Sequence, residues 1–341
     1  MSTPDIHQVL KQYWGYERFR PLQEEIIQAV LAGKDTLALL PTGGGKSLCF
    51  QVPALVSGGI CVVVSPLIAL MKDQVENLRL RGIKAEAVYS GMSYREIDRI
   101  LDNCAYGDIR FLYVSPERLA TDLFKVRVQK MKVNLLAVDE AHCISQWGYD
   151  FRPEYLQIAE IRPLMKDIPV LALTASATSQ VVEDIQQRLL FPKLNVFRKS
   201  FERKNLHYHV RIVEDKNTKM IDVCRNVKGT GIVYVRNRRS TKELAALLGK
   251  NKISADFYHA GLTHKEREQK QNNWKQNKTR VMVCTNAFGM GIDKPDVRFV
   301  VHYEIPDGPE AYYQEAGRAG RDEKKHLPCY STIRLIKWKL N

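Results

Sequence analysis

A glycine-rich loop between a predicted strand and a predicted helix constrains this chain more than any other feature. Apolar residues at 37–40 predict a buried strand, and a helix is predicted over residues 47–55. Glycines in the loop let backbone N–H groups turn inward and approach an anion closely. Lys46 adds a mobile positive charge for outer phosphates, and the Ser47 hydroxyl can bind Mg²⁺. The loop residues that we expect to cradle phosphate are Gly43, Gly44, Gly45, Lys46 and Ser47.

The short pattern is incomplete, because Leu40 stands where the first glycine of such loops usually lies. A glycine-rich loop that binds nothing therefore remains an alternative.

Three side chains ahead of the loop form a candidate base-binding set. Tyr16 offers a stacking face, Arg20 a guanidinium, and Gln23 a donor and an acceptor for one base edge. They precede or begin a predicted helix that runs to about residue 31. We expect them to hold a purine, although a helix start with a packed tyrosine would also explain them.

Strands and helices alternate along both halves of the chain. This alternation predicts an α/β fold with parallel sheets covered by helices on both faces, and ligands at the carboxyl ends of the strands. The pattern breaks near residues 191–201 and then restarts without a phosphate loop, which predicts two domains, 1–203 and 204–341. The predicted strands are 37–40, 60–64, 111–114, 135–138 and 170–173 in the first half, and 231–235, 255–257, 280–284 and 297–301 in the second.

Two adjacent carboxylates at the end of a predicted buried strand are the natural partners of Lys46. Nucleotide hydrolysis requires Mg²⁺ on the phosphate oxygens and a base that orients the attacking water. We expect Asp139 to hold the metal ion and Glu140 to take the proton of the water. The alternative is a strand end whose acidic residues meet a helix dipole.

Basic residues near the end of the second half suit a triphosphate. Gln314, Arg318 and Arg321 are spaced so that they would share one face if the segment were helical. Guanidinium groups there would stabilise the charge that develops on the γ-phosphate, and hydrolysis would then require the two domains to close. An exposed basic helix end is the alternative.

Composition limits the partners and the compartment. The net charge of +14 favours a polyanion partner, and a membrane surface is less suitable because neither an amphipathic anchor nor a lipidation motif occurs. No apolar run reaches the roughly 18 residues of a membrane span, and the N-terminus lacks a secretory signal. The seven cysteines are odd in number and form no C-x-x-C pair. We therefore expect free thiols in a reducing cytoplasm and no zinc site.

An aromatic segment directly after the carboxylate pair is a candidate single-strand contact. Aromatic rings interleaved with arginine form stacking platforms for unpaired bases, although a core-packing loop has a similar composition. Hydroxyl groups at the predicted strand ends could also meet phosphate oxygens. The candidate residues are Trp147, Phe151 and Arg152 in the aromatic segment, and Ser65, Ser115 and Thr174 at the strand ends.

Taken together, these motifs resemble the helicase core of the RecQ family, a group of superfamily-two DNA helicases, over about residues 5–325. The segment 15–23 resembles the family's adenine motif, residues 42–47 its phosphate loop, and residues 139–142 its DEAH box. The further motifs that carry the resemblance lie at 65–73, 173–178, 231–236, 258–262, 284–295 and 314–322.

The resemblance implies two tandem RecA-like P-loop domains that bind ATP and Mg²⁺ and move 3′ to 5′ on single-stranded or partly duplex DNA. It also implies a role in DNA repair and recombination, in a bacterial-type cytoplasm near the nucleoid. It adds Thr42 to the phosphate loop, makes His142 a relay to the aromatic segment, and places Asp293 near the ribose.

Two rival functions stay open at this point. Family members usually continue into a zinc-binding subdomain and a winged helix, and residues 326–341 do not match the pattern expected there. The chain could therefore be a DNA-binding fragment with weak or uncoupled ATP hydrolysis. An RNA-directed helicase is the other alternative.

Overall fold

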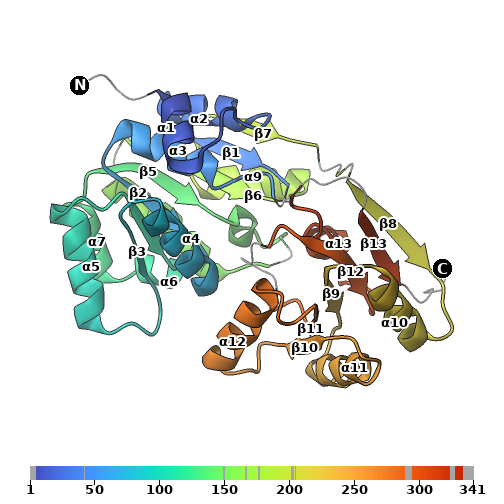
Figure 1. Cartoon of the computed structure of the whole chain (residues 1–341). Helices are drawn as coiled ribbons and strands as arrows, with labels where there is room; N and C mark the ends of the chain where they lie inside the picture. Colours follow the sequence, from blue (N-terminus) through green and yellow to red (C-terminus); the bar gives the residue numbers. More distant parts are fainter. Residues whose placement is uncertain are drawn as a thin grey trace. The chain divides into compact units, whose positions relative to one another are not determined.

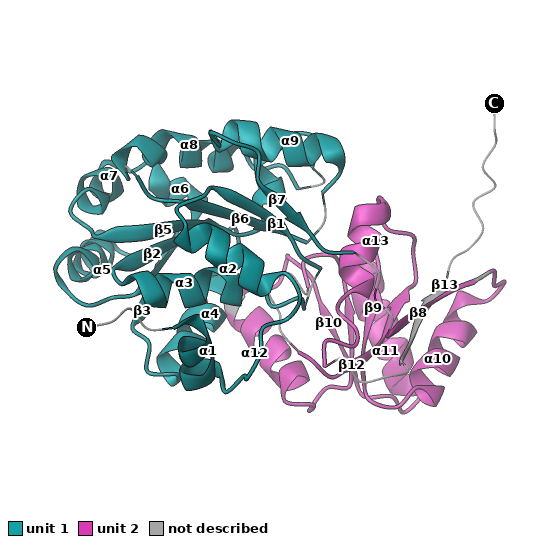
Figure 2. Cartoon of the chain, turned by 90° about the horizontal axis from the view of Figure 1, so that it is seen from above, with its two compact units in different colours: residues 1–201 teal, residues 202–341 magenta. Residues whose placement is uncertain are grey.

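The computed structural model describes residues 5–332, except 42, 149, 166, 176, 201, 202, 204, 289–293 and 323–326. The chain forms two compact units, Met1–Phe201 and Glu202–Asn341 (Figure 2). The domain limits predicted from the sequence, 1–203 and 204–341, stay a prediction. None of the helices in the described part of the chain combines the length and the apolarity that a bilayer-crossing segment requires.

Unit 1 is built on a seven-stranded sheet in which every pair of neighbours is parallel. The strand that leads into the glycine loop, β1, lies between β6 and β7, which are the last strands of the unit in sequence. The strands, in spatial order, are β3 (Ala85–Val88), β4 (Phe111–Val114), β2 (Ile60–Val64), β5 (Val133–Val138), β6 (Val170–Thr174), β1 (Thr36–Leu39) and β7 (Val196–Arg198).

Helices cover both faces of this sheet (Figure 2). Alternate residues of β2 divide between two cores, because successive side chains of a strand point to opposite faces: Cys61 and Val63 belong to one and Val62 to the other. The first core is shared with α2 (Gln23–Leu31), α3 (Leu48–Ser57) and α4 (Ile68–Leu80), and α1 (Ile6–Trp14) packs beside them. The second is shared with α5 (Tyr94–Tyr106), α6 (Pro116–Leu119), α7 (Asp122–Val128), α8 (Gln157–Ile161) and α9 (Ser179–Arg188).

Unit 2 repeats the design on a smaller scale (Figure 1). Its central sheet has four parallel strands in the order β10-β11-β9-β12, and a separate parallel pair joins β13 to β8. The elements are β8 (Leu206–Arg211), α10 (Lys216–Asn226), β9 (Thr230–Tyr234), α11 (Arg238–Lys250), β10 (Ala255–Tyr258), α12 (His264–Lys275), β11 (Val281–Cys284), β12 (Val297–His302), α13 (Pro309–Ala316) and β13 (Leu327–Thr332).

The predicted fold class is confirmed, since both units are parallel α/β domains of the RecA-like kind. The strands Ile60–Val64 and Phe111–Val114 have the predicted bounds. The sequence prediction missed β3, β7, β8 and β13. Of these, β7 is a three-residue edge strand with Val196 and Arg198 exposed, so it carries no run of buried residues to reveal it.

Candidate active site

The glycine loop connects β1 to α3, as predicted, and its backbone requires glycine. Gly43 and Gly45 have φ angles of 79° and 74°, which are left-handed values that side chains disfavour. A Cβ atom on Gly44 would lie 2.8 Å from the carbonyl oxygen of Pro41. The loop therefore has a backbone conformation that favours glycine at these positions, immediately before the N-terminus of α3. Thr42 lies outside the described residues.

The two polar residues of the predicted base-binding set hold this loop in place. Gln23 is buried, and its Nε2 donates hydrogen bonds to the carbonyl oxygens of Gly45 and Gly44 at 3.0 and 3.3 Å. Its Oε1 accepts a bond from the backbone N–H of Arg20 at 2.8 Å, and the Arg20 guanidinium donates to the carbonyl of Gly43. The structure thus brings Gln23 and Arg20 to the phosphate loop.

Tyr16 completes the base-binding set from the loop before α2. Its side chain is 55% exposed, so its ring is available for stacking. The predicted contact of these three residues with a purine stays a prediction.

The carboxylate pair lies at the carboxyl end of β5, where the chain turns sharply. Glu140 has a left-handed φ of 48°, and the short 3₁₀ helix Ala141–Ile144 follows. The backbone N–H of Glu140 donates to Asp139 Oδ1 at 3.0 Å, and the Tyr155 hydroxyl donates to the Asp139 carbonyl at 2.9 Å. This turn sets the two acidic side chains in different environments.

Lys46 and Glu140 meet across the ends of the strands. Lys46 Nζ lies 3.8 Å from Glu140 Oε1, and both side chains are mostly buried. Residues about ninety positions apart in sequence are therefore neighbours, as the sequence prediction requires. An ammonium group beside a carboxylate at a glycine loop can hold a phosphate and a water molecule close together.

Asp139 is suited to hold a cation. Burial and the neighbouring Glu140 raise the pKa of its carboxyl group to about 6, although Lys46 acts in the opposite direction. A buried carboxylate with so little compensation gains from a divalent ion, and Mg²⁺ prefers oxygen ligands. Asp139 and the Ser47 hydroxyl are the residues that would hold Mg²⁺; bound there, the ion would neutralise phosphate charge.

His142 connects the carboxylate to the next strand. Its Nδ1 lies 2.9 Å from Thr174 Oγ1 and 3.4 Å from Glu140 Oε2. Burial lowers the pKa of His142, so the ring is neutral at physiological pH. The end of β6 is thereby linked to Glu140 at the end of β5.

The three strand-end hydroxyls, by contrast, are buried. Ser65, Ser115 and Thr174 are each at most 2% exposed. Ser115 Oγ donates to Glu117 Oε1 at 2.7 Å, and Thr174 bonds to His142, whereas Ser65 Oγ has no partner among the described residues. Their predicted contact with nucleic-acid phosphates stays a prediction, and in this structure two of the three hydroxyls serve internal bonds.

The aromatic segment presents one ring to solvent. Trp147 is 65% exposed, and Phe151 is half-buried. Arg152 is committed to internal partners: its Nη2 lies 3.0 Å from Asp150 Oδ2, and its Nη1 donates to the Pro66 carbonyl at 3.0 Å. Trp147 is therefore the member of the set that is ready to stack on a base.

The predicted shared helical face in unit 2 is wrong. Gln314 lies on α13, but that helix ends at Ala316 and is followed by turns, with Gly320 at a φ of 61°. Arg318, which lies in these turns, is mostly buried. The glycines at 317 and 320 break the helix that the spacing assumed. Asp293 lies outside the described residues.

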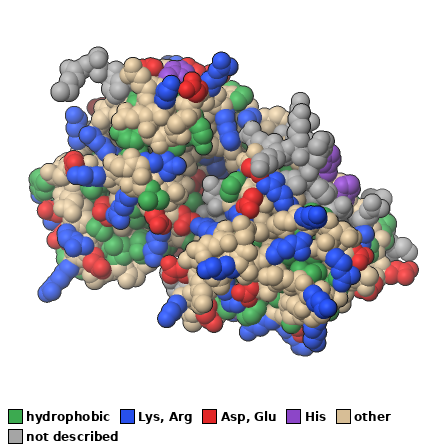
Figure 3. Space-filling model, viewed as in Figure 1, with side chains coloured by type: hydrophobic (Ala, Val, Ile, Leu, Met, Phe, Trp, Pro, Cys, Tyr) green, Lys and Arg blue, Asp and Glu red, His purple; other side chains and the backbone are tan. Residues whose placement is uncertain are grey.

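On the face drawn in Figure 3, Lys and Arg side chains are scattered over both units and interleaved with acidic ones.

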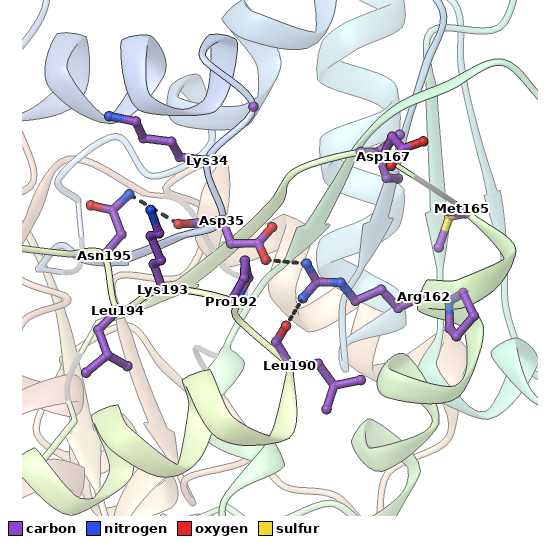
Figure 4. Close-up of a pocket in the computed structure, with 13 residues that line it drawn as sticks. Lys34, Asp35, Arg162, Met165, Asp167, Leu190, Pro192, Lys193, Leu194 and Asn195 are labelled. Atoms are coloured by element: carbon purple, nitrogen blue, oxygen red, sulfur yellow. Dashed lines mark hydrogen bonds and ion pairs between the residues drawn. The ribbon is translucent and has the colours of Figure 1, made fainter.

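A cavity of about 940 Å³ lies at the amino ends of the unit 1 strands, whereas the glycine loop and the carboxylate pair follow their carboxyl ends (Figure 4). Asp35, immediately before β1, lines it together with Arg162, and the two side chains form an ion pair. None of the predicted site residues lines this cavity, so the candidate active site is elsewhere.

Comparison with known proteins shows what the chain is similar to. The family model described as DEAD/DEAH box helicase matches residues 20–185, and the helicase conserved C-terminal domain matches residues 215–323. ATP-dependent DNA helicase RecQ of Pasteurella multocida is 44% identical over 97% of this chain. The chain belongs to the RecQ family of helicases.

This RecQ-family chain spans about half the length of the curated relatives that it matches, including 54% of the Pasteurella protein. It covers 65% of the probable ATP-dependent DNA helicase RecS of Bacillus subtilis, with 42% identity.

Solved structures support the fold of the RecQ-family core. The DEAD-box helicase Mss116, bound to single-stranded RNA, superimposes with a TM-score of 0.79 at 19% identity, over 98% of this chain and 74% of that one. The Mycobacterium smegmatis helicase Lhr gives 0.78 at 19% identity, over 96% of this chain and 47% of that one.

Proposed function

We propose that the chain is an ATP-dependent DNA helicase motor that hydrolyses ATP on single-stranded DNA and moves 3′ to 5′. The observation that carries the proposal is the meeting of Lys46 with Glu140, beside the buried carboxylate of Asp139. The identity to proteins named as RecQ DNA helicases over nearly the whole chain supports DNA as the polymer.

The roles of the residues follow from their surroundings. Lys46 would neutralise the outer phosphates, and the glycine loop would give its N–H groups to their oxygens. Glu140, ionised beside Lys46, would accept the proton of the attacking water. Mg²⁺ would supply charge neutralisation at the phosphates, held by Ser47 and Asp139.

Arg318, Arg321 and Gln314 of unit 2 would complete the site if the units close on the nucleotide. Closure of that kind would couple hydrolysis to movement along DNA, with Trp147 stacked on an unpaired base. The proposal includes a role in repair and recombination, a cytoplasmic location near the nucleoid, and ATP and Mg²⁺ as cofactors, and the family supports it.

ATP turnover measured against single-stranded DNA concentration tests the proposal. Single-stranded DNA should increase the rate of ATP turnover by the wild-type chain. Glu140→Gln should reduce turnover by about 100-fold or more, because a general base is lost while the shape is kept. Asp108→Asn, in an exposed ion pair with Lys84, is the matched control and should leave turnover unchanged.

The other outcomes separate the rivals. Hydrolysis that DNA does not stimulate would overturn the proposal and favour a fragment that binds DNA without coupling. Equal or greater stimulation by RNA of the same length would favour an RNA-directed helicase. Unwinding of a duplex with a 3′ single-stranded tail, but not with a 5′ tail, checks the direction.

A further inference from the structure

Three chemically different ligand groups converge behind the catalytic carboxylate. They are His142 Nε2, Cys143 Sγ and Asp150 Oδ2, which all lie within 4.8 Å of one another. Cys143 Sγ is 3.7 Å from His142 Nε2 and 3.8 Å from Asp150 Oδ2. His142 and Cys143 are buried, and Asp150 is partly exposed at the edge of the cluster. The proposed hydrolysis uses neither the thiol nor this carboxylate.

The spacing suits a tetrahedral metal ion. Zinc binds sulfur at about 2.3 Å and nitrogen or oxygen at about 2.0–2.2 Å. Tetrahedral geometry then separates a sulfur from a nitrogen or oxygen ligand by roughly 3.5 Å. The two observed distances exceed this value by only a few tenths of an ångström, so small side-chain movements would bring the three atoms around one ion.

The imidazole is already oriented as a metal ligand. In metal sites the non-ligating nitrogen of a histidine usually bonds to a hydroxyl, carbonyl or carboxylate, which fixes the ring. Here Nδ1 of His142 lies 2.9 Å from Thr174 Oγ1 and 3.4 Å from Glu140 Oε2. The Nε2 nitrogen consequently faces Cys143 and Asp150.

Metal binding at Cys143 must displace a proton. Burial raises the pKa of the Cys143 thiol, so the group carries its proton in the absence of a metal ion. Metal binding would release that proton to solvent and form a metal–thiolate bond, leaving one thiolate and one carboxylate around a double positive charge. Asp150 Oδ2 lies 3.0 Å from Arg152 Nη2, and it would bind the metal ion in place of this guanidinium group.

We propose that His142, Cys143 and Asp150 form a binding site for a thiophilic divalent cation, Zn²⁺ or Cd²⁺, with water as the fourth ligand. The sulfur and imidazole ligands select such ions over Mg²⁺, which prefers oxygen. The sequence expectation of no zinc site considered only pairs of cysteines, and this proposal departs from it because the ligands are of three types.

The ion would act as an inhibitor of coupling. By binding His142 and Cys143 together with Asp150, the ion would link the segment after Glu140 to the aromatic segment. It would also separate Asp150 from Arg152. This consequence rests on the proposed function, whereas metal binding itself does not. We expect the cation to suppress DNA-stimulated hydrolysis more than basal hydrolysis.

Cadmium titration without nucleotide tests the site directly, because a cadmium–thiolate bond has a charge-transfer absorption in the ultraviolet. All samples carry Cys329→Ser, so that the thiol of Cys329, whose side chain the structure does not describe, cannot contribute to the absorption. The chain should show saturable absorption, which Cys143→Ser should abolish. Cys104→Ser, at a buried cysteine of α5, is the matched control and should retain it.

Two further variants test the site without replacing the buried Cys143. Asp150→Ala, at the exposed edge, should weaken cadmium binding about tenfold or more, and Thr174→Val should weaken it roughly 10- to 100-fold by releasing the imidazole. Absorption that survives Cys143→Ser, or affinity unchanged by Asp150→Ala in a folded chain, would overturn the site. Saturable binding without loss of DNA stimulation would overturn only the inhibitory role.

Discussion

Replacing Asp139 with asparagine should stabilise the nucleotide-free protein while it removes activity. Burial and Glu140 hold the pKa of Asp139 at about 6, against its usual value of 3.8. The ionised carboxylate is therefore less favourable in the folded chain than in the unfolded one. The difference of 6 − 3.8 = 2.2 pKa units corresponds to about 3 kcal/mol of lost stability at high pH.

The stability that Asp139→Asn adds should be larger at high pH than at low pH. The folded state binds the proton more tightly, so the wild-type chain has its full stability below pH 3.8 and loses it as the pH rises towards about 6. Asparagine cannot ionise, and its Oδ1 can still accept the Glu140 N–H bond. Because the new amide must be accommodated, we expect a gain of about 1–3 kcal/mol at pH 8 and roughly half of it at pH 5.

Urea unfolding without ATP or Mg²⁺, followed by circular dichroism at both pH values, measures this gain. Asp98→Asn is the control, since Asp98 lies on the surface in an ion pair with Arg127 and should show a small loss of about 0–1 kcal/mol. A variant at position 139 that is no more stable than wild type at pH 8, or that gains equally at both pH values, would refute the reasoning.

Three further predictions concern other parts of unit 1. Arg162→Met leaves the carboxylate of Asp35, 5% exposed, without its ion pair and should cost about 3–5 kcal/mol in urea unfolding; a cost below about 1 kcal/mol would contradict a buried pair. Trp147→Ala should reduce DNA stimulation of ATP turnover but leave basal turnover and melting temperature unchanged, because the ring is 65% exposed; equal loss of both rates would indicate a packing role. Gln23→Ala removes the bonds to the glycine loop and should weaken nucleotide affinity about tenfold in equilibrium titration, with unchanged affinity as the contrary result.

Local pattern predicted the parts of the fold that lie in the buried sheets. Strands such as Ile60–Val64 are fully buried on both faces, so they read as unbroken apolar runs. The helix Tyr94–Tyr106 was missed even though Ser93 and Glu96 form a capping box, a signal that the sequence carries. The strand β8 was missed although it also carries a signal, because Leu206, Tyr208 and Val210 alternate with polar residues.

The sequence predicted that Lys46 meets Glu140, but it did not predict the partners of Gln23. The proximity of Lys46 and Glu140 follows from two strand ends on one edge of a parallel sheet, which topology alone implies. The bonds of Gln23 to glycine carbonyls depend on the path of the loop, and periodicity contains no information about that path. To predict the end of the helix before Arg318, the glycines at 317 and 320 should have counted for more than the spacing of the polar residues.

The position of β1 in the sheet has a consequence for synthesis of the protein. Among the described residues its strand neighbours are β6 and β7, which are the last strands of unit 1 in sequence. A ribosome therefore makes nearly the entire first unit before this strand can pair on either edge. Until then the apolar β1 segment has no sheet to join, so it stays unpaired in the emerging chain while the rest of the unit is made.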